Sequence, residues 1–138
     1  MIPNILLYIM PIVVLVGGGL VLMLADAFQS EEGGLAIPTA GLHIAAAACA
    51  LALWNVAGDP ATVQSATRVL GGYMAFDRQT LFLYATIALG GGLASLLAGG
   101  YLPEHGLERG EFYSLLTFAS AGAMMLAGAN DLVMIFIG

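Results

Sequence analysis

His43 is the only ionisable side chain that lies deep within an apolar stretch of this sequence, in the run 35–57. An imidazole changes its charge near physiological pH, so a buried histidine can relay protons. A relay also needs partners, and the apolar runs offer only hydroxyls: Tyr84, Thr86, Ser114, Thr117 and Ser120. Such hydroxyls usually bond to their own backbone or join helices. We therefore expect a neutral His43, bonded to a neighbouring helix or facing a small wet pocket, and keep the relay as the alternative.

Three aspartates lie at predicted helix ends. Asp77 and Asp131 precede apolar runs and fit as N-terminal caps, where the helix dipole favours negative charge. Asp26 closes the first run at a C-terminus, where the dipole disfavours it. We expect a structural reason for Asp26, such as a hydrogen bond to another helix.

No catalytic, cofactor-binding or metal-binding set can be assembled from the sequence. Cys49 is the only cysteine, so neither an internal disulfide nor a thiolate metal site is possible within the chain. It fits as a small residue at a helix contact. The sequence thus predicts no catalytic, cofactor or metal residue here.

The composition is that of a protein in lipid. Hydrophobic residues make up 60% of the chain and charged residues 9%, with a mean hydropathy of +0.96. A soluble chain of this length could not bury so much apolar surface. Nine acids face three arginines and no lysine, for a net charge of −6. No basic face exists for nucleic acid or for a patch of anionic lipid.

The apolar runs predict an all-α, polytopic transmembrane helix bundle with four spanning helices and the start of a fifth. The runs are 5–25, 35–57, 81–102, 112–129 and 132–138, with a loop expected over 58–77. The first run lacks a basic flank and is too long for a signal peptide, so we expect it to be retained. The last run covers only about 10 Å of a core of roughly 30 Å. The sequence is therefore expected to be a fragment.

Small residues indicate where these helices pack. The triplets 17–19 and 90–92 fall within spans and predict packing sites or local weak points in a helix. Ser95 and Gly99 predict a close contact for the third span. Ala119, Ala123 and Ala127 form a small-residue ridge on the fourth, which would let another helix approach closely.

The stretch 101–138 resembles the antiporter-like membrane subunits of proton-pumping NADH–quinone oxidoreductase, respiratory complex I. It is most similar to subunit N, whose mitochondrial and plastid counterparts are the subunit 2 proteins. The pattern that carries this resemblance is Gly106-x-x-Arg109-Gly110-Glu111-Phe112-Tyr113-x-Leu115-Leu116, followed by Ala129-Asn130-Asp131-Leu132 and Phe136-Ile137-Gly138. Residues 1–100 agree more loosely, through the helix number, Leu24-Ala25-Asp26-Ala27-Phe28 and Asp77.

The resemblance implies the N-terminal fragment of a subunit of about fourteen helices, built around inverted repeats that carry proton half-channels. Residues 1–110 would be three leading helices, and residues 111–138 the first helix of a repeat and the truncated start of the next. The family's proton-carrying glutamate and lysines would lie beyond Gly138, so no such role is transferred to a residue here. The fragment would contribute packing and assembly.

The resemblance also implies partners and a location. The enzyme would be the parent NADH:quinone oxidoreductase, a translocase. NADH, quinone (ubiquinone in the respiratory chain), FMN and iron–sulfur clusters would belong to other subunits, and this chain would hold no cofactor. Its partners would be the lipid bilayer, other membrane subunits and protons, in the bacterial inner membrane.

Two alternatives remain open at the level of the sequence. One is a subunit of a related cation/proton antiporter complex. The other is a free-standing four-helix scaffold or assembly protein in the membrane. A small multidrug transporter fits poorly, because its first helix would need an embedded carboxylate and the run 5–25 has none.

Overall fold

A computed structural model gives the fold and describes residues 5–28, 34–107 and 110–138, without the side chain of Ile5. The described part is helical. Its elements are α1 Ile5–Tyr8, α2 Met10–Phe28, α3 Ala36–Ala52, the 3₁₀ turn η1 Val56–Gly58, α4 Pro60–Val69, α5 Arg78–Glu104, α6 Gly110–Ala127 and α7 Leu132–Ile137.

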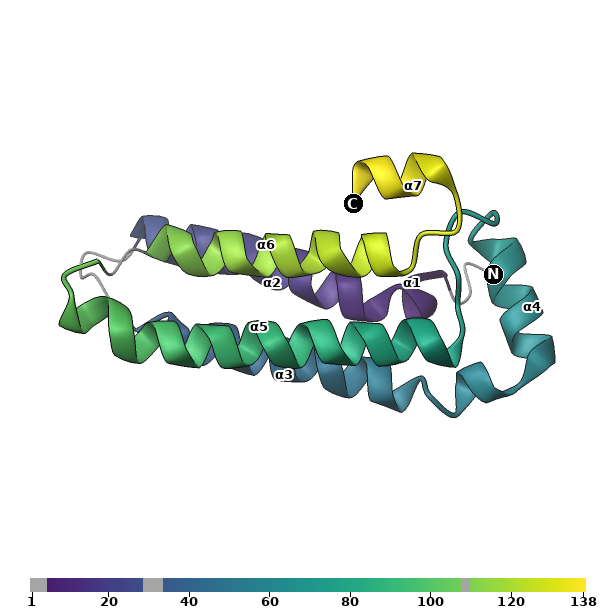
Figure 1. Cartoon of the computed structure of the whole chain (residues 1–138), viewed down its shortest axis with the longest axis horizontal. Helices are drawn as coiled ribbons and strands as arrows, with labels where there is room; N and C mark the ends of the chain where they lie inside the picture. Colours follow the sequence, from purple (N-terminus) through teal and green to yellow (C-terminus); the bar gives the residue numbers. More distant parts are fainter. Residues whose placement is uncertain (1–4, 29–33, 108–109) are drawn as a thin grey trace.

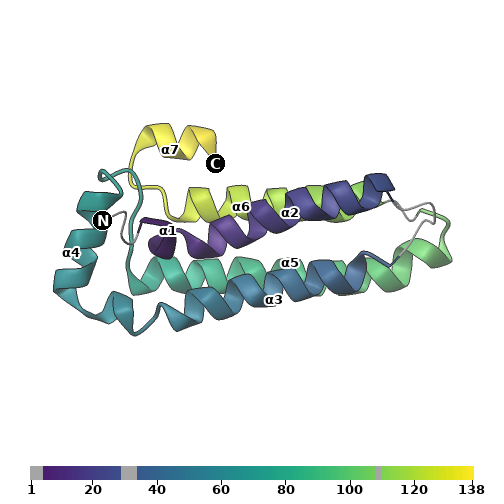
Figure 2. The same ribbon diagram turned by 180° about the vertical axis from the view of Figure 1, so that it is seen from behind.

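Four long helices lie side by side, with α3 along α5 and α2 along α6 (Figures 1 and 2). The short helix α4 crosses one end of this bundle, and α7 folds back beside α6 at the same end (Figure 1). Apolar side chains such as Leu15, Leu81 and Met124 fill the space between the long helices. The all-helical prediction is therefore confirmed for the described residues.

Three segments are long and apolar enough to cross a membrane: α2, the stretch Ala36–Gly58 that joins α3 to η1, and α5. By length and hydropathy, the expected four spans and the start of a fifth are not confirmed. Helix α6 carries Glu111 in its first turn and several hydroxyl residues, which lower its hydropathy. Helix α7 has only 6 described helical residues.

Glycines let the long helices approach one another. A methyl group added at Gly18 would overlap Leu42 of α3, and one added at Gly99 would overlap Ala36. Ser95 of α5 donates a hydrogen bond to the Ala36 carbonyl oxygen at 2.8 Å. The packing role predicted for the glycine triplets is thus confirmed at Gly18, and that predicted for Ser95 with Gly99 is confirmed as well.

The alanine ridge of α6 has a different setting from the one expected. Ala119 and Ala123 are exposed in the described structure, and Ala127 is half-buried. The buried face of α6 instead presents Thr117 and Ser120 to its neighbours. In the described structure, α6 therefore packs against the other long helices through the face that carries Thr117 and Ser120.

The segment 58–77 contains a helix where the sequence predicted only a loop. Asp59 and Pro60 had been interpreted as a turn, but Asp59 is the N-cap of α4 and Pro60 its first residue. Proline fits this position because its missing N–H would have no helical partner there. The prediction of an unbroken loop was wrong. A short amphipathic helix with many polar residues contains no long apolar run, and such runs were what the sequence reading used to locate helices.

Asp77 and Asp131 both occupy N-cap positions, as predicted. The Asp77 carboxylate accepts from the backbone N–H of Thr80 at 2.7 Å and so caps α5. Asp131 precedes α7 but makes no side-chain capping bond. Only Asp77 satisfies a free amide of its helix.

Asp59→Ala is expected to fray α4. The Asp59 carboxylate accepts from both the hydroxyl and the backbone N–H of Thr62, at 2.6 and 3.1 Å, and these bonds hold the pKa of Asp59 below its usual value. A lowered pKa means that the cap stabilises α4 above the pKa of the unfolded chain and is lost as the pH falls through the folded pKa. The protection factors of the amides in 60–69 against hydrogen exchange should fall in the variant, and in the wild type on acidification.

Asp59→Asn is the matched control, because asparagine also caps helices but does not titrate in this range. It should protect the same amides at neutral pH and lose no protection in acid. Equal exchange in Asp59→Ala and the wild type would contradict the capping role.

Candidate functional site

One of the fully buried polar side chains of the bundle is His43, near the middle of α3. Its side chain is 0% exposed. Nδ1 lies 2.9 Å from the carbonyl oxygen of Thr39 on the same helix, and Nε2 lies 3.1 Å from Oγ of Ser120 on α6. His43 is thus hydrogen-bonded to a neighbouring helix, as expected from the sequence.

Two glycines of α5 complete the site around His43. A methyl group added at Gly91 would overlap the imidazole ring and would lie 2.8 Å from Oγ of Ser120. One added at Gly92 would lie 3.3 Å from the His43 Cβ. Helices α3, α5 and α6 therefore meet at one tightly packed polar contact.

The hydroxyls named in the sequence line the buried side of α6 and one side of α5. Thr117 donates to the carbonyl oxygen of Tyr113, and Oγ of Ser120 lies within hydrogen-bond distance of that of Leu116, both at 2.8 Å. On α5, Thr86 does the same to Phe82. This back-bonding to the preceding turn is what the sequence predicted for hydroxyls in apolar helices.

A small cavity of about 230 Å³ lies at the end of the bundle where α2 ends and α6 begins. Asp26, Glu111 and Ser114 line it together with apolar side chains. The hydroxyl of Ser114 is buried and has no hydrogen-bond partner among the described residues. The predicted partner residues Ser114 and His43 therefore belong to different places on the bundle.

The setting of Asp26 differs from the hydrogen bond expected for it. No hydrogen bond to its carboxylate is found among the described residues, and a methyl group added at Gly110 would overlap that carboxylate. Gly110 begins α6, so the charge of Asp26 lies against a helix N-terminus, where the dipole favours it. This placement offsets its unfavourable position at the C-terminus of α2.

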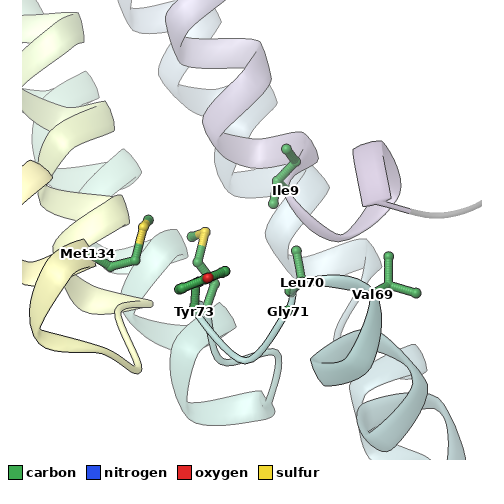
Figure 3. A pocket seen from close by; sticks show the side chains of 7 residues that line it. Ile9, Val69, Leu70, Gly71, Tyr73 and Met134 are labelled. Atoms are coloured by element: carbon green, nitrogen blue, oxygen red, sulfur yellow. The ribbon is translucent and has the colours of Figure 1, made fainter.

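An apolar pocket of about 390 Å³ lies at the opposite end, between α1, the end of α4 and α7 (Figure 3). In the view of Figure 3, Met134 and Tyr73 lie next to each other on one side, and Ile9, Leu70 and Val69 lie on the other. Its lining offers no charged group. At the same end the Arg78 guanidinium lies 6.0 Å from the centre of the Trp54 ring, an arrangement suited to a membrane–water interface.

Within the described residues, this arrangement can hold helices together, and no step of catalysis can be assigned to it. No group of three or more His, Cys, Asp or Glu that could hold a metal occurs there. Cys49 is a free, half-buried thiol on α3. Arg109, which belongs to the motif that resembles subunit N, lies outside the described residues.

The curated relatives described here are all named NADH-quinone oxidoreductase subunit N. The chain is 45% identical over 93% of its length to NADH-quinone oxidoreductase subunit N 1 of Sorangium cellulosum, of which the match covers 27%. It is 34% identical over 94% of its length to subunit N of Myxococcus xanthus, with 24% of that protein covered. This chain is a homologue of subunit N. Specifically, it corresponds to a partial N-terminal region.

Subunit N of Chloroflexus aggregans is also similar, at 32% identity over 93% of this chain and 25% of that protein. The chain spans about a quarter of the length of these curated subunit N relatives. No protein-family profile matches the chain. No solved structure matches it either. Homology to subunit N, together with several apolar helices, makes the chain part of a multi-pass membrane protein.

Two features of the site could not be found by reading the sequence. The pairing of His43 with Ser120 joins residues that are 77 positions apart, and no local pattern signals it. The contact of Asp26 with Gly110 likewise depends on how α2 and α6 meet. The glycine triplets were the only available signal, because they mark where a neighbour can come close.

Proposed function

We propose that this chain is the N-terminal part of a proton-translocating membrane subunit of NADH–quinone oxidoreductase, and that it contributes packing and assembly. The observation that carries the proposal is the 45% identity to a subunit N over nearly the whole chain. The described helices support a scaffolding role, since their charged side chains stand near helix ends. The proton-carrying residues would then lie in other parts of the subunit.

In this proposal α2, α3 with η1, α5 and α6 are four spanning helices, and α7 is the start of a fifth. The position of α6 supports its inclusion, because it runs beside α2 and α5 (Figure 1). Its hydroxyl residues Ser114, Thr117 and Ser120 are buried. Residues 1–110 would form the leading helices. Residues 111–138 would form the first helix of an inverted repeat and the beginning of the next.

The outward faces of the helices would meet lipid and neighbouring membrane helices. Large apolar side chains are exposed along α5, among them Leu89, Leu93 and Leu97. Exposed apolar surface of this extent needs an apolar solvent or a partner. We assign the bacterial inner membrane as the location, other subunits of the complex as partners, and protons as the transported ion. NADH oxidation and quinone reduction would take place in the other subunits.

Deletion of the gene that encodes this chain is the direct test. Membranes of the deletion strain should lose their NADH:quinone activity down to the background of other dehydrogenases. In native gels, the wild-type band that oxidises NADH should contain peptides of this chain. Reintroducing the gene should restore both readouts, whereas an NADH-oxidising complex that lacks this chain in the wild type would refute the proposal.

A further inference from the structure

His43 is a buried titratable group to which the proposed function gives no role, and the hydrogens around it can be counted. Its Nδ1 lies 2.9 Å from the carbonyl oxygen of Thr39. A carbonyl oxygen can only accept, so Nδ1 carries a hydrogen. The charge of His43 therefore depends on whether Nε2 also carries one.

Nε2 faces Ser120, whose single hydroxyl hydrogen has two acceptors within reach. Oγ of Ser120 lies 3.1 Å from Nε2 and 2.8 Å from the carbonyl oxygen of Leu116. If the hydroxyl donates to Leu116, Nε2 either carries its own hydrogen, which makes the imidazole a cation, or stays buried without a hydrogen-bond partner. If the hydroxyl donates to Nε2, the imidazole is neutral. The Leu116 carbonyl then still accepts the backbone N–H four residues later, which belongs to Ser120.

The surroundings of His43 decide between these two arrangements. Four helices pack at or near the site, and their charged residues within the described structure stand near the helix ends: Asp26, Arg78, Glu104 and Glu111. The other titratable groups of these helices, besides His43 itself, are the thiol of Cys49 and the phenols of Tyr84, Tyr101 and Tyr113, and none of them is a carboxylate. Burying a cation without a counter-charge is unfavourable, because no attraction to an opposite charge offsets the hydration free energy that it loses. The neutral arrangement keeps every hydrogen-bonding group paired and buries no charge.

We infer that His43 is a positioning residue, held neutral with its hydrogen on Nδ1, which fixes α6 against α3 and α5 by accepting the hydroxyl hydrogen of Ser120. Gly91 presses α5 against the same ring, so neither helix can shift without disturbing this contact. The consequence for the complex rests on the proposed function, whereas the protonation state does not.

Nitrogen NMR of histidine-labelled protein in lipid membranes tests the protonation state. The full native subunit is compared with its His43→Gln variant, and the difference spectrum isolates His43. We expect one protonated and one unprotonated ring nitrogen at neutral pH, with the hydrogen on Nδ1. Two protonated ring nitrogens would overturn the inference and favour a proton relay. A hydrogen on Nε2 in place of Nδ1 would overturn it as well.

A second comparison tests positioning and does not require His43→Gln to fold. Ser120→Ala removes the donor and leaves Nε2 buried without a partner, which costs more than an exposed hydroxyl deletion. The assembled complex should lose its NADH:quinone activity on heating at a temperature several degrees lower. Thr86→Ala deletes an exposed, back-bonded hydroxyl of α5 and should leave that temperature unchanged. Equal behaviour of the two variants would refute the positioning role.

The two proposals fail in different ways. A doubly protonated His43, in a complex that still assembles with NADH:quinone activity, contradicts only the inference about His43. A neutral His43 of the expected tautomer, in a protein that never occurs with an NADH-oxidising complex, contradicts only the proposed function.

A conservative Ser120→Cys variant, which keeps a weak donor at this place, should recover part of the thermal stability lost in Ser120→Ala.

Discussion

Gly91→Ala is expected to destabilise the bundle by about 1–3 kcal/mol, the usual cost of overfilling a packed core. The added methyl group would overlap the His43 ring and press on Oγ of Ser120. His43 cannot move away, because both of its ring nitrogens are hydrogen-bonded and its side chain is 0% exposed. The midpoint temperature of thermal unfolding of the protein in detergent should therefore fall by several degrees.

Gly90→Ala is a matched control on the same helix. A methyl group at Gly90 meets no atom within 4 Å, so it adds no steric strain. Alanine also has the higher helix propensity, by up to about 1 kcal/mol. This variant should be as stable as the wild type or slightly more stable. Equal losses in the two variants would mean that the contact between α5 and His43 does not limit the packing.

The glycine pair shows how far the sequence could predict the fold. Hydropathy located three spanning segments to within a few residues, because about 20 apolar residues in a row have few other structures available. The glycine triplet 90–92 marked a packing site in the same way. It could not show that Gly91 faces a histidine while Gly90 faces open space, because that depends on the rotation of α5 about its axis.

The missed helix α4 illustrates a different limit. Its ten residues Pro60–Val69 carry threonines, a glutamine, a serine and an arginine, so no apolar run signals them. Its first turn nevertheless follows a local rule, with Asp59 as cap and Pro60 as first residue. The same two residues also fit a turn, and only the contacts of α4 with η1 and α1 separate the two interpretations.

The candidate site was predictable in its residue types but not in its partners. A lone histidine among hydroxyls favoured a neutral, hydrogen-bonded role, and the contacts of His43 confirm the hydrogen bonding. Which hydroxyl it bonds was unpredictable, because Ser114, Thr117 and Ser120 share one face of α6 and differ only in depth. Depth along a helix pair is set by the turns that join the helices, and these turns are not encoded in the apolar pattern.

One such turn joins α6 to α7 and is held by three hydrogen bonds to the segment after α4. Ala75 donates its backbone N–H to the Gly128 carbonyl oxygen at 2.8 Å, and Asn130 donates to that of Tyr73 at 2.9 Å. The Asn130 side-chain amide donates to the Gly72 carbonyl oxygen at 3.0 Å. These bonds fix the point from which α7 starts.

Gly128→Ala is expected to disturb this turn strongly, because the added methyl group would overlap the Tyr84 hydroxyl. Tyr84 is buried between α5 and α6, so the turn is the part that must move. We expect a loss of about 1–3 kcal/mol, as for other overpacked positions. Hydrogen exchange of the Ala75 and Asn130 amides should accelerate, since both report directly on the pairing of this turn.

Tyr84→Phe in the Gly128→Ala background should restore most of the lost stability. Removing the hydroxyl leaves the ring carbon Cζ as the nearest tyrosine atom, 3.1 Å from the added methyl group, and a shift of a few tenths of an ångström accommodates it. Both amides should then recover their slow exchange, while Tyr84→Phe alone serves as the reference for the missing hydroxyl. If the double variant remained as unstable as Gly128→Ala, the strain would have to come from the backbone of the turn. The contact between α5 and the α6–α7 turn would then not be what places α7.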